Sequence, residues 1–402
     1  MYTEKCLQAG CENMKKDWDT VFPYNIGTIP FYYTDLDNPH NPEGIPDFLD
    51  FNIDFDRITG TLTQKYDDNI QSLLNKAYSN GSQITGYMDD YEFGEKYTKD
   101  FLDFIIKNEG DIKGCSVLEI GCGTGFLLSL LENMGASVTG IEPGKQAEKG
   151  IKKYKINIIN DYYPSENIDK KYDIIIFYNV LEHISCIEPF LSSVKKQLKA
   201  NARIYFAVPD CGKAIECSDI SMLIHEHYNY FTSDTLENTF AEYANLKADI
   251  SKSDFGSELY GIAVNDGIYH GHTADINEIM YMNGNYIKNA DHKIIIFKKF
   301  LNEIDKDGKA LGIYVPSRAL NMLSLIKEDI DLEKIDFFDD NPNLSGRYFP
   351  GFNKVIKCRS DLMNNPADYV LIMSYTFGDS IRNDLKKCLD NKTVIIKYEE
   401  LV

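Results

Sequence analysis

The glycine-rich segment at residues 117–126 constrains the fold of this chain more than any other feature. It reads Val-Leu-Glu-Ile-Gly-Cys-Gly-Thr-Gly-Phe, an apolar run that passes through three glycines into a helical pattern. Glycines between a strand and a helix allow a tight turn, and they leave the first amides of the helix open to a ligand. The segment therefore predicts a βαβ unit of a parallel sheet with a binding site at its first turn.

Short apolar runs continue to alternate with helical periods as far as residue 266. The strands expected from this pattern are 117–120, 137–141, 156–159, 172–177, 203–208, 247–250 and 260–264, and the expected helices are 91–107, 126–134, 187–198 and 235–244. Strands separated by helices favour right-handed crossovers and a sheet covered on both faces. We therefore expect a seven-stranded sheet in this part of the chain.

A second alternation begins at residue 309 and predicts a smaller α/β domain. Its expected strands are 310–315, 334–339, 369–374 and 393–397, and its expected helices are 319–327 and 381–389. Prolines and a glycine interrupt the aromatic, acidic segment before residue 90, so we expect irregular structure there. The expected organisation is an N-terminal lid or substrate segment at 1–90, a sheet domain at 91–266, a connector at 267–308 and a C-terminal domain at 309–402.

The composition excludes several classes of partner. Asp and Glu number 62 against 42 Lys and Arg, a formal net charge of −20, which would repel nucleic acid and anionic membranes. No run approaches the ~18 apolar residues of a membrane span, and the first residues lack a signal-peptide pattern, so we expect a cytoplasmic protein. The nine cysteines form no CxxC pair and indicate reduced thiols. Cys6 and Cys11 alone are too few to make a zinc site.

Two carboxylates define the chemistry expected of the glycine-rich turn. Glu119 lies at the end of the strand, where it disfavours a pyrophosphate and favours a cationic ligand. Glu142 ends the second expected strand and is placed to accept hydrogen bonds from a ribose diol. A dinucleotide-binding loop remains the alternative, although its GxGxxG spacing leaves both acids unexplained.

With these acids, residues 100–266 resemble the class I S-adenosylmethionine-dependent methyltransferases. The resemblance implies S-adenosylmethionine as cofactor and a seven-stranded Rossmann-like sheet. The smaller, Rossmann-like C-terminal domain and the irregular N-terminal segment are expected from the patterns described above. The implied cofactor contacts are Glu119, Gly121, Gly123 and Gly125 for the methionine and ribose, Glu142 for the ribose hydroxyls, Asp161 near the adenine, and Asn179 after the fourth strand.

Two histidine motifs are expected at the same rim of the sheet. Asn-Val-Leu-Glu-His at 179–183 follows the fourth strand, and Ile-His-Glu-His at 224–227 follows the fifth. Imidazoles flanking a carboxylate provide a base that titrates near neutrality and an acid that orients it. A metal site would need a third ligand, which His183 could supply, but with no cysteine or second acid nearby we expect no metal. Histidines that bond loop carbonyls are the plainer alternative.

These motifs resemble a narrower family, the sugar C-methyltransferases that act on nucleotide-linked keto-deoxysugars. That family also carries Asp-x-Asn-Pro-x-x-x-Gly-Arg-Tyr-x-Pro-Gly, matched at 339–351, and Asp-Tyr-Val-Leu-Ile, matched at 368–372. Two features depart from it. Ile224 replaces a tyrosine, and the family's N-terminal zinc module is not recognisable in residues 1–60.

The resemblance implies roles for the histidine motifs. His227 would take a proton from the carbon next to the sugar carbonyl, and Glu226 would orient it. His225 and His183 would stabilise the oxyanion or shuttle protons. Tyr87 or Tyr91 could replace the family's catalytic tyrosine.

Two arginines are the candidates for holding the diphosphate of a nucleotide sugar. Arg318 follows the first strand of the C-terminal domain, and Arg347 lies in the family motif. The alternative for Arg347 is a surface turn in which it pairs with Asp339 or Asp340.

We therefore expect C-methylation of a nucleotide-linked keto-deoxysugar through a base-generated enediolate. An N- or O-methyltransferase acting on a sugar or another small metabolite is the alternative. A non-catalytic binder is a third hypothesis, but a binder has no use for a base. The expected partner is a small molecule, and the oligomeric state is open.

Overall fold

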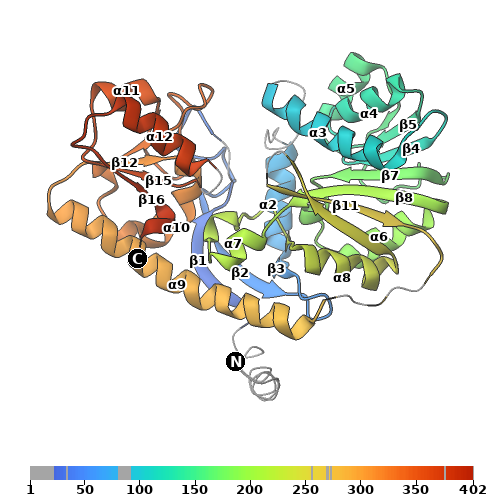
Figure 1. Ribbon diagram of the computed structural model, residues 1–402, viewed down its shortest axis with the longest axis horizontal. Helices are drawn as coiled ribbons and strands as arrows, with labels where there is room; N and C mark the ends of the chain where they lie inside the picture. The colour runs from blue at the N-terminus through green and yellow to red at the C-terminus, as the bar shows by residue number, and fades with distance from the viewer. Residues whose placement is uncertain are drawn as a thin grey trace. The chain divides into compact units, whose positions relative to one another are not determined.

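The computed structural model of the protein describes residues 22–32, 35–79, 92–254, 257–268, 271, 274–374 and 377–401 (Figure 1). Contacts within the chain divide it into two units. Of the residues that the structure describes, the seven-stranded unit comprises those within 22–24, 53–213 and 226–281, and the five-stranded unit comprises those within 25–52, 214–225 and 282–401. Two short segments, 25–52 and 214–225, thus belong with the C-terminal part of the chain. The linear boundaries expected from the sequence did not include this exchange.

The larger sheet confirms the expected seven strands. They are β4 (Ser116–Ile120), β5 (Ser137–Ile141), β6 (Ile158–Ile159), β7 (Tyr172–Tyr178), β8 (Leu198–Pro209), β10 (Lys247–Lys252) and β11 (Glu258–Val264). Their order is β10-β11-β8-β7-β4-β5-β6, and only the pairs formed by β11 are antiparallel. The winding direction reverses between β4 and β7, and an open sheet binds its ligand at the carboxyl ends of strands at such a point.

Helices cover both faces of this sheet (Figure 1). The cluster on one face takes residues from α3 (Glu92–Glu109), α4 (Phe126–Asn133) and α5 (Gln146–Tyr154). The cluster on the other face takes residues from α6 (Ile187–Lys196) and α8 (Ser233–Ala244). Because strand side chains alternate, Ile176 packs on the first face and Phe177 on the second. The nearly continuous apolar runs in the sequence are therefore strands buried on both sides.

The segment before residue 90 is more regular than the sequence analysis expected. Its described part contains β1 (Tyr24–Pro30), β2 (Phe48–Phe55), β3 (Leu62–Gln64) and α2 (Asp68–Ser79). In β2, Phe51, Ile53 and Phe55 are buried while the residues between them are more exposed. This period-two pattern lies among prolines and glycines, which hid it. β3 pairs antiparallel with β2 and with β9 (Asn229–Tyr230). The pairing with β9 fixes the position of the chain directly after His227.

The five-stranded unit confirms the second, smaller Rossmann-like domain. Its strands are β12 (Leu311–Tyr314), β13 (Ile335–Phe338), β14 (Ile356–Lys357), β15 (Tyr369–Ile372) and β16 (Val394–Lys397). All are parallel, in the order β14-β13-β12-β15-β16. Its helices include α10 (Leu320–Ile326), α11 (Arg359–Asn364) and α12 (Gly378–Cys388). The expected connector contains the long helix α9 (Ile276–Lys306).

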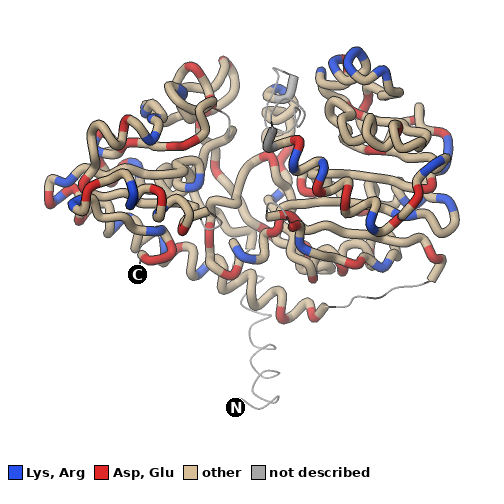
Figure 2. The backbone as a smooth tube through the Cα atoms, turned by 45° about the horizontal axis from the view of Figure 1, so that its top comes forward, with Lys and Arg blue, Asp and Glu red and all other residues tan. Residues whose placement is uncertain are grey.

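Charge is distributed unevenly along the chain. Figure 2 shows acidic residues in both units, while a run of five lysines between residues 145 and 155 lies on and beside α5. Among the described residues, no helix combines the length and apolar character that crossing a membrane requires.

Gly150 joins α5 to the glycine-rich turn and provides a test of this packing. A Cβ at Gly150 would lie 2.1 Å from the carbonyl oxygen of Thr124, which is backbone and cannot swing away. Alanine normally stabilises a helix interior by about 1 kcal/mol relative to glycine. We expect Gly150→Ala instead to lower the free energy of unfolding by about 1–3 kcal/mol through overpacking, as measured by urea unfolding.

The exposed neighbour Lys149 provides the control for this experiment. Lys149→Ala should change stability by no more than about 0.5 kcal/mol. A Gly150→Ala protein that is as stable as the parent would show that the α5 contact is not tight.

Candidate functional site

The glycine-rich turn after β4 needs glycine for both conformation and space. Gly121, Gly123 and Gly125 have φ values of 70°, 54° and 73°, in the left-handed region that other residues rarely adopt. A Cβ on Gly121 would lie 2.5 Å from the Val180 side chain, and one on Gly125 would lie 2.4 Å from Ile156. The turn therefore brings its backbone against the ends of neighbouring strands.

Two buried carboxylates border this turn. Glu142 accepts hydrogen bonds from the backbone amides of Gly123 at 3.1 Å and Gly144 at 2.7 Å. Glu119 is 4% exposed, and its Oε2 atom forms no hydrogen bond with any described residue. Burial raises the pKa of Glu119 well above its usual range, and the charge of Glu142 adds to the effect. A ligand that carries positive charge or donates hydrogen bonds would relieve this excess of acceptors.

Asn179 provides a second unmet acceptor at the end of β7. Its φ of 53° is left-handed, and its Nδ2 donates to Glu258 Oε1 at 2.8 Å. Its Oδ1 atom is buried without a hydrogen bond to the described part of the chain. Glu258 also accepts from the Tyr178 hydroxyl at 3.1 Å. Because Glu258 begins β11 opposite Pro209 at the end of β8, antiparallel pairing brings it to this edge of the sheet.

Asp161, expected near the adenine, is bonded within its own loop. Its carboxylate accepts from the Ser165 hydroxyl at 2.6 Å, from the Tyr162 amide at 2.8 Å and from the Asn167 side chain at 3.3 Å. The hydrogen bond from Ser165, followed by the amide of Tyr162, lowers the pKa of Asp161. A contact with adenine therefore stays a prediction.

The unmet acceptors test whether S-adenosylmethionine fits this edge. Glu119 and Asn179 lie at the ends of β4 and β7, on either side of the point where the winding reverses. The cofactor carries an ammonium group, a sulfonium and two ribose hydroxyls, which are cationic groups and hydrogen-bond donors. The donor-poor, acceptor-rich environment of these residues therefore fits this molecule.

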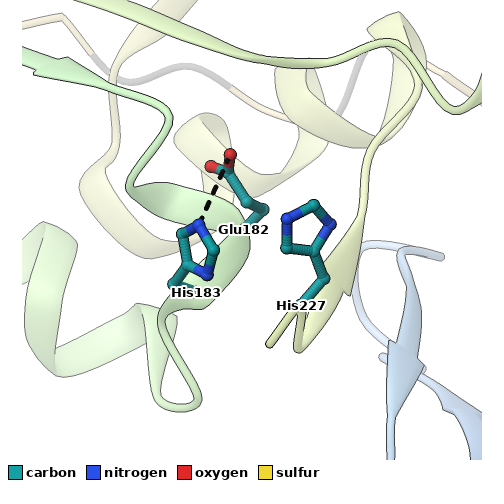
Figure 3. A group of neighbouring side chains, drawn as sticks. All are labelled: Glu182, His183 and His227. Carbon is teal, nitrogen blue, oxygen red and sulfur yellow. Dashed lines mark ion pairs between the residues drawn. The ribbon is translucent and has the colours of Figure 1, made fainter. Parts of the chain in front are cut away.

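A second group of side chains converges near the end of β7 (Figure 3). The rings of His183 and His227 lie with their centroids 4.8 Å apart and their planes at 78°. His183 ends the short helix η1 (Leu181–His183), and His227 precedes β9. Glu182 Oε1 lies 3.9 Å from His183 Nε2. We call Glu182, His183 and His227 the imidazole–carboxylate cluster.

Burial sets the protonation of this cluster. It lowers the pKa of His183 and lowers that of His227 further, because the neighbouring His183 disfavours a second positive charge. It raises the pKa of Glu182 to about 8. Because burial lowers the pKa of both histidines below the ordinary value of 6.5, both rings are neutral at pH 7. Glu182 is 1% exposed, and its Oε2 forms no hydrogen bond with a described residue.

Glu182 is the acid that the sequence analysis found lacking. It lies beside His183 within the motif at 179–183, but that motif was interpreted only through its asparagine and histidine. The signal was present as an acid directly after a buried strand, where parallel sheets place functional groups. Among the described residues, Glu182, His183 and His227 form a group whose ligand atoms all lie within 4.8 Å of one another.

The His-Glu-His triplet divides between different environments. His225 is 0% exposed and packs in the five-stranded unit against Phe31 at 5.3 Å and Phe51 at 5.1 Å, with Nε2 3.3 Å from the Leu49 carbonyl oxygen. Burial lowers the pKa of His225 to about 4. Glu226 contributes its backbone carbonyl to the site, 2.8 Å from His183 Nδ1. Of the triplet, His227 is the member that joins His183.

The residues expected to bind substrate are placed in the five-stranded unit or lie outside the described residues. Arg347 forms an ion pair with Asp35, so the expected alternative partners Asp339 and Asp340 are wrong. Asp340 forms its ion pair with Arg359 instead. Arg318 Nη1 lies 3.4 Å from the Ser221 hydroxyl. Tyr87 and Tyr91 lie outside the described residues, and the role of both arginines in holding a diphosphate stays a prediction.

Glu258 should give the unfolding free energy a distinct pH dependence. Burial raises its pKa from 4.5 to about 7 in the folded protein. The folded state therefore holds a proton that the unfolded state releases, so stability falls as pH rises from about 4.5 to 7. Glu258→Gln should remove this pH-dependent loss of unfolding free energy, which amounts to at most about 3 kcal/mol. Urea unfolding between pH 5 and 8 measures it.

The exposed residue Glu132 provides the matched control, because Glu132→Gln removes a carboxylate that is already solvated. Its stability curve should stay parallel to that of the parent. A Glu258→Gln curve that is also parallel would contradict the assignment.

Comparison with sequence families identifies the two parts of the chain. Residues 64–248 match a family described as methyltransferase domain, and residues 263–398 match one described as C-methyltransferase C-terminal domain.

Relatives with curated names match a shorter region. The ubiquinone biosynthesis O-methyltransferase of Pelagibacter ubique is 33% identical over 119 residues, covering 28% of this chain and 49% of that protein. The enzyme of the same name from Pseudoalteromonas translucida is 29% identical over 115 residues, covering 26% and 48%. The chain thus spans about half the length of the curated relatives it matches.

Solved structures show similarity at low identity. The N-methyltransferase NodS from Bradyrhizobium japonicum, in complex with S-adenosylhomocysteine, is 15% identical, with 50% of this chain and 99% of that chain covered and a TM-score of 0.37. Magnesium protoporphyrin IX methyltransferase from Synechocystis, with bound S-adenosylhomocysteine, is 15% identical, with 49% and 99% covered and a TM-score of 0.36.

The family matches and the acceptor-rich turn between β4 and β7 lead to one conclusion: the chain contains a class I S-adenosylmethionine-dependent methyltransferase domain followed by a C-methyltransferase C-terminal domain.

Proposed function

We propose that this protein transfers a methyl group from S-adenosylmethionine to a carbon atom of a nucleotide-linked keto-deoxysugar. The observation that carries the proposal is the C-methyltransferase C-terminal domain at residues 263–398, which contains both sequence motifs shared with the sugar C-methyltransferases. The imidazole–carboxylate cluster at the rim of the methyltransferase sheet supports it, because carbon methylation needs a group that removes a proton.

O-methylation of a small metabolite is the second candidate. The curated relatives that match are named as O-methyltransferases, but the match with the Pelagibacter protein covers 28% of this chain. An O-methyltransferase would use the same cluster to deprotonate a hydroxyl. The two candidates differ in the bond that loses its proton, which is C–H in the first and O–H in the second.

Three side chains of the sheet edge would hold the cofactor. Glu119 and the Asn179 side-chain oxygen would accept from its ammonium group, and Glu142, which also braces the glycine turn, would accept from its ribose. When bound, the cofactor supplies an electrophilic methyl group on a sulfonium. The protein's part is to orient it and to exclude water, since a dry site strengthens the attraction between sulfonium and enediolate.

The substrate must become a carbanion equivalent before it can accept a methyl group. Loss of the proton from the carbon next to the carbonyl gives an enediolate, whose carbon then attacks. We assign the proton acceptor to the imidazole–carboxylate cluster. Within the described residues the His227 side chain makes ring contacts only, with His183 and Tyr230, so its ring nitrogens are open. Removal of this proton requires His227 in either of two roles. Its ring takes the proton directly, or its ring holds a second group that takes the proton.

Glu119→Gln tests the cofactor edge. The substitution keeps the shape of the side chain and removes the charge that would face the ammonium group. A charge-assisted hydrogen bond contributes about 1.5–3 kcal/mol, so the dissociation constant for S-adenosylhomocysteine should rise about 10- to 100-fold in titration calorimetry. Glu132→Gln, on the exposed face of α4, should bind as the parent does. Equal affinity in both variants would remove Glu119 from the cofactor site.

Solvent exchange distinguishes carbon from heteroatom methylation. The protein is incubated in D₂O with S-adenosylhomocysteine and nucleotide-linked 4-keto-deoxysugars, and NMR follows the protons next to the carbonyl. We expect exchange that falls about 100-fold or more in His227→Ala, because general bases contribute that much. His292→Ala changes an exposed histidine of α9 and should leave exchange intact. Methyl transfer to oxygen or nitrogen, without exchange in any keto sugar, would refute the proposal.

A further inference from the structure

The imidazole–carboxylate cluster contains more than a general base needs. Two imidazoles and one carboxylate present their ligand atoms within 4.8 Å of one another, and Glu182 Oε1 lies 3.9 Å from His183 Nε2. Figure 3 shows the Glu182 carboxylate above the gap between the two rings. Two nitrogens and one oxygen form a donor set typical of zinc and related divalent transition metals.

The Glu182 carboxyl group is buried more deeply than its few contacts would lead one to expect. Glu182 is 1% exposed, and its Oε2 forms no hydrogen bond with a described residue. Within the described chain its ion-pair contact is with His183, whose Nε2 lies 3.9 Å from Glu182 Oε1 and is therefore too far for a hydrogen bond. Burying an unpaired carboxylate is costly, and such groups are normally paired or coordinate a metal. A cation between Glu182 and the rings would displace the proton that burial holds on Glu182 and would pair with the resulting carboxylate.

The hydrogen bonding of His183 orients its ring as a ligand. Nδ1 and the Glu226 carbonyl oxygen are 2.8 Å apart, and a carbonyl can only accept, so Nδ1 carries the proton. Nε2 is therefore the nitrogen with the free lone pair, and it is the one that faces Glu182. Metal-ligating histidines almost always donate their other ring N–H to a carbonyl or carboxylate in this way.

We infer that Glu182, His183 and His227 bind one divalent cation of the zinc type and leave coordination positions open for substrate. Three protein ligands with an open position are typical of catalytic rather than structural zinc. Both rings are only partly buried, whereas Glu182 is fully buried, so the open side is the side of the histidines.

The chemical use of this cation rests on the proposed function. The cation would hold the carbonyl oxygen of the keto sugar and a hydroxide, with His227 as ligand. The hydroxide takes the proton from the adjacent carbon and becomes water, while the electron pair of the broken C–H bond stays in the enediolate on the cation. The carbon of this enediolate then attacks the methyl group. Positive charge fixed at that oxygen lowers the barrier to deprotonation.

Metal titration of the full chain tests the site without relying on activity. The protein, carrying no polyhistidine tag, is stripped with a chelator and titrated with Zn²⁺ and, as a spectroscopic probe, with Co²⁺. We expect one site per chain with cobalt d–d absorption and no thiolate charge-transfer band, which distinguishes it from binding by the nine cysteines. Glu182→Gln and His227→Ala should each weaken this site by more than the 10- to 100-fold cost of losing an outer-shell partner.

Matched variants show whether the loss is specific. Glu132→Gln removes an exposed carboxylate of α4, and His292→Ala removes an exposed histidine of α9; both should keep the cobalt spectrum. Binding of S-adenosylhomocysteine verifies that each variant is folded. A cobalt spectrum unchanged in Glu182→Gln, a spectrum dominated by thiolate, or the absence of binding would each overturn the site.

The exchange assay separates this inference from the proposed function. Cation binding at the cluster without exchange in any keto sugar supports the site and counts against the proposed substrate. Full exchange by chelator-stripped protein supports the proposed substrate and overturns the role of the cation. Exchange that is lost on stripping and restored by Zn²⁺ supports both.

Discussion

Burial of carboxyl groups at one edge of an apolar sheet is the constraint on which the site depends. Glu119, Glu182 and Glu258 are buried at or near the ends of β4, β7 and β11, and burial raises the pKa of each. Carboxylates are expensive to hold in such surroundings unless a cation or a hydrogen-bond donor meets them. The sheet therefore holds these carboxyl groups where a bound ligand would satisfy them. The same edge therefore offers acceptors both to a cationic cofactor and to the divalent cation that we infer at Glu182, His183 and His227.

The apolar interior of the sheet keeps these groups in place. Phe177, Phe206 and Phe240 stack through the second face, with the Phe206 and Phe240 centroids 4.3 Å apart. On the first face the glycine turn packs closely enough that Gly150 has no room for a methyl group. Rigid supports of this kind matter because a site misplaced by 1 Å can lose most of its activity.

Much of the fold could be predicted from local patterns. The run of isoleucines and aromatics in β7 and the glycines after β4 indicated a parallel sheet, because buried strands and positive φ angles each demand particular residues. β2 was missed because its alternation is short and lies between Pro46 and Gly60. Glu258 could not be assigned to the site because only the antiparallel register of β11 against β8 brings it there.

The sequence by itself determined that a glycine turn would follow Glu119 at the end of one strand and that Glu142 would end the next strand, since the strand–turn–helix pattern is encoded locally. The tertiary structure decided which side chains share an environment. It buries His225 between two phenylalanine rings, while His227, two residues later, faces His183 beside Glu182. That outcome depends on packing between segments distant in the chain, which no spacing of residues encodes.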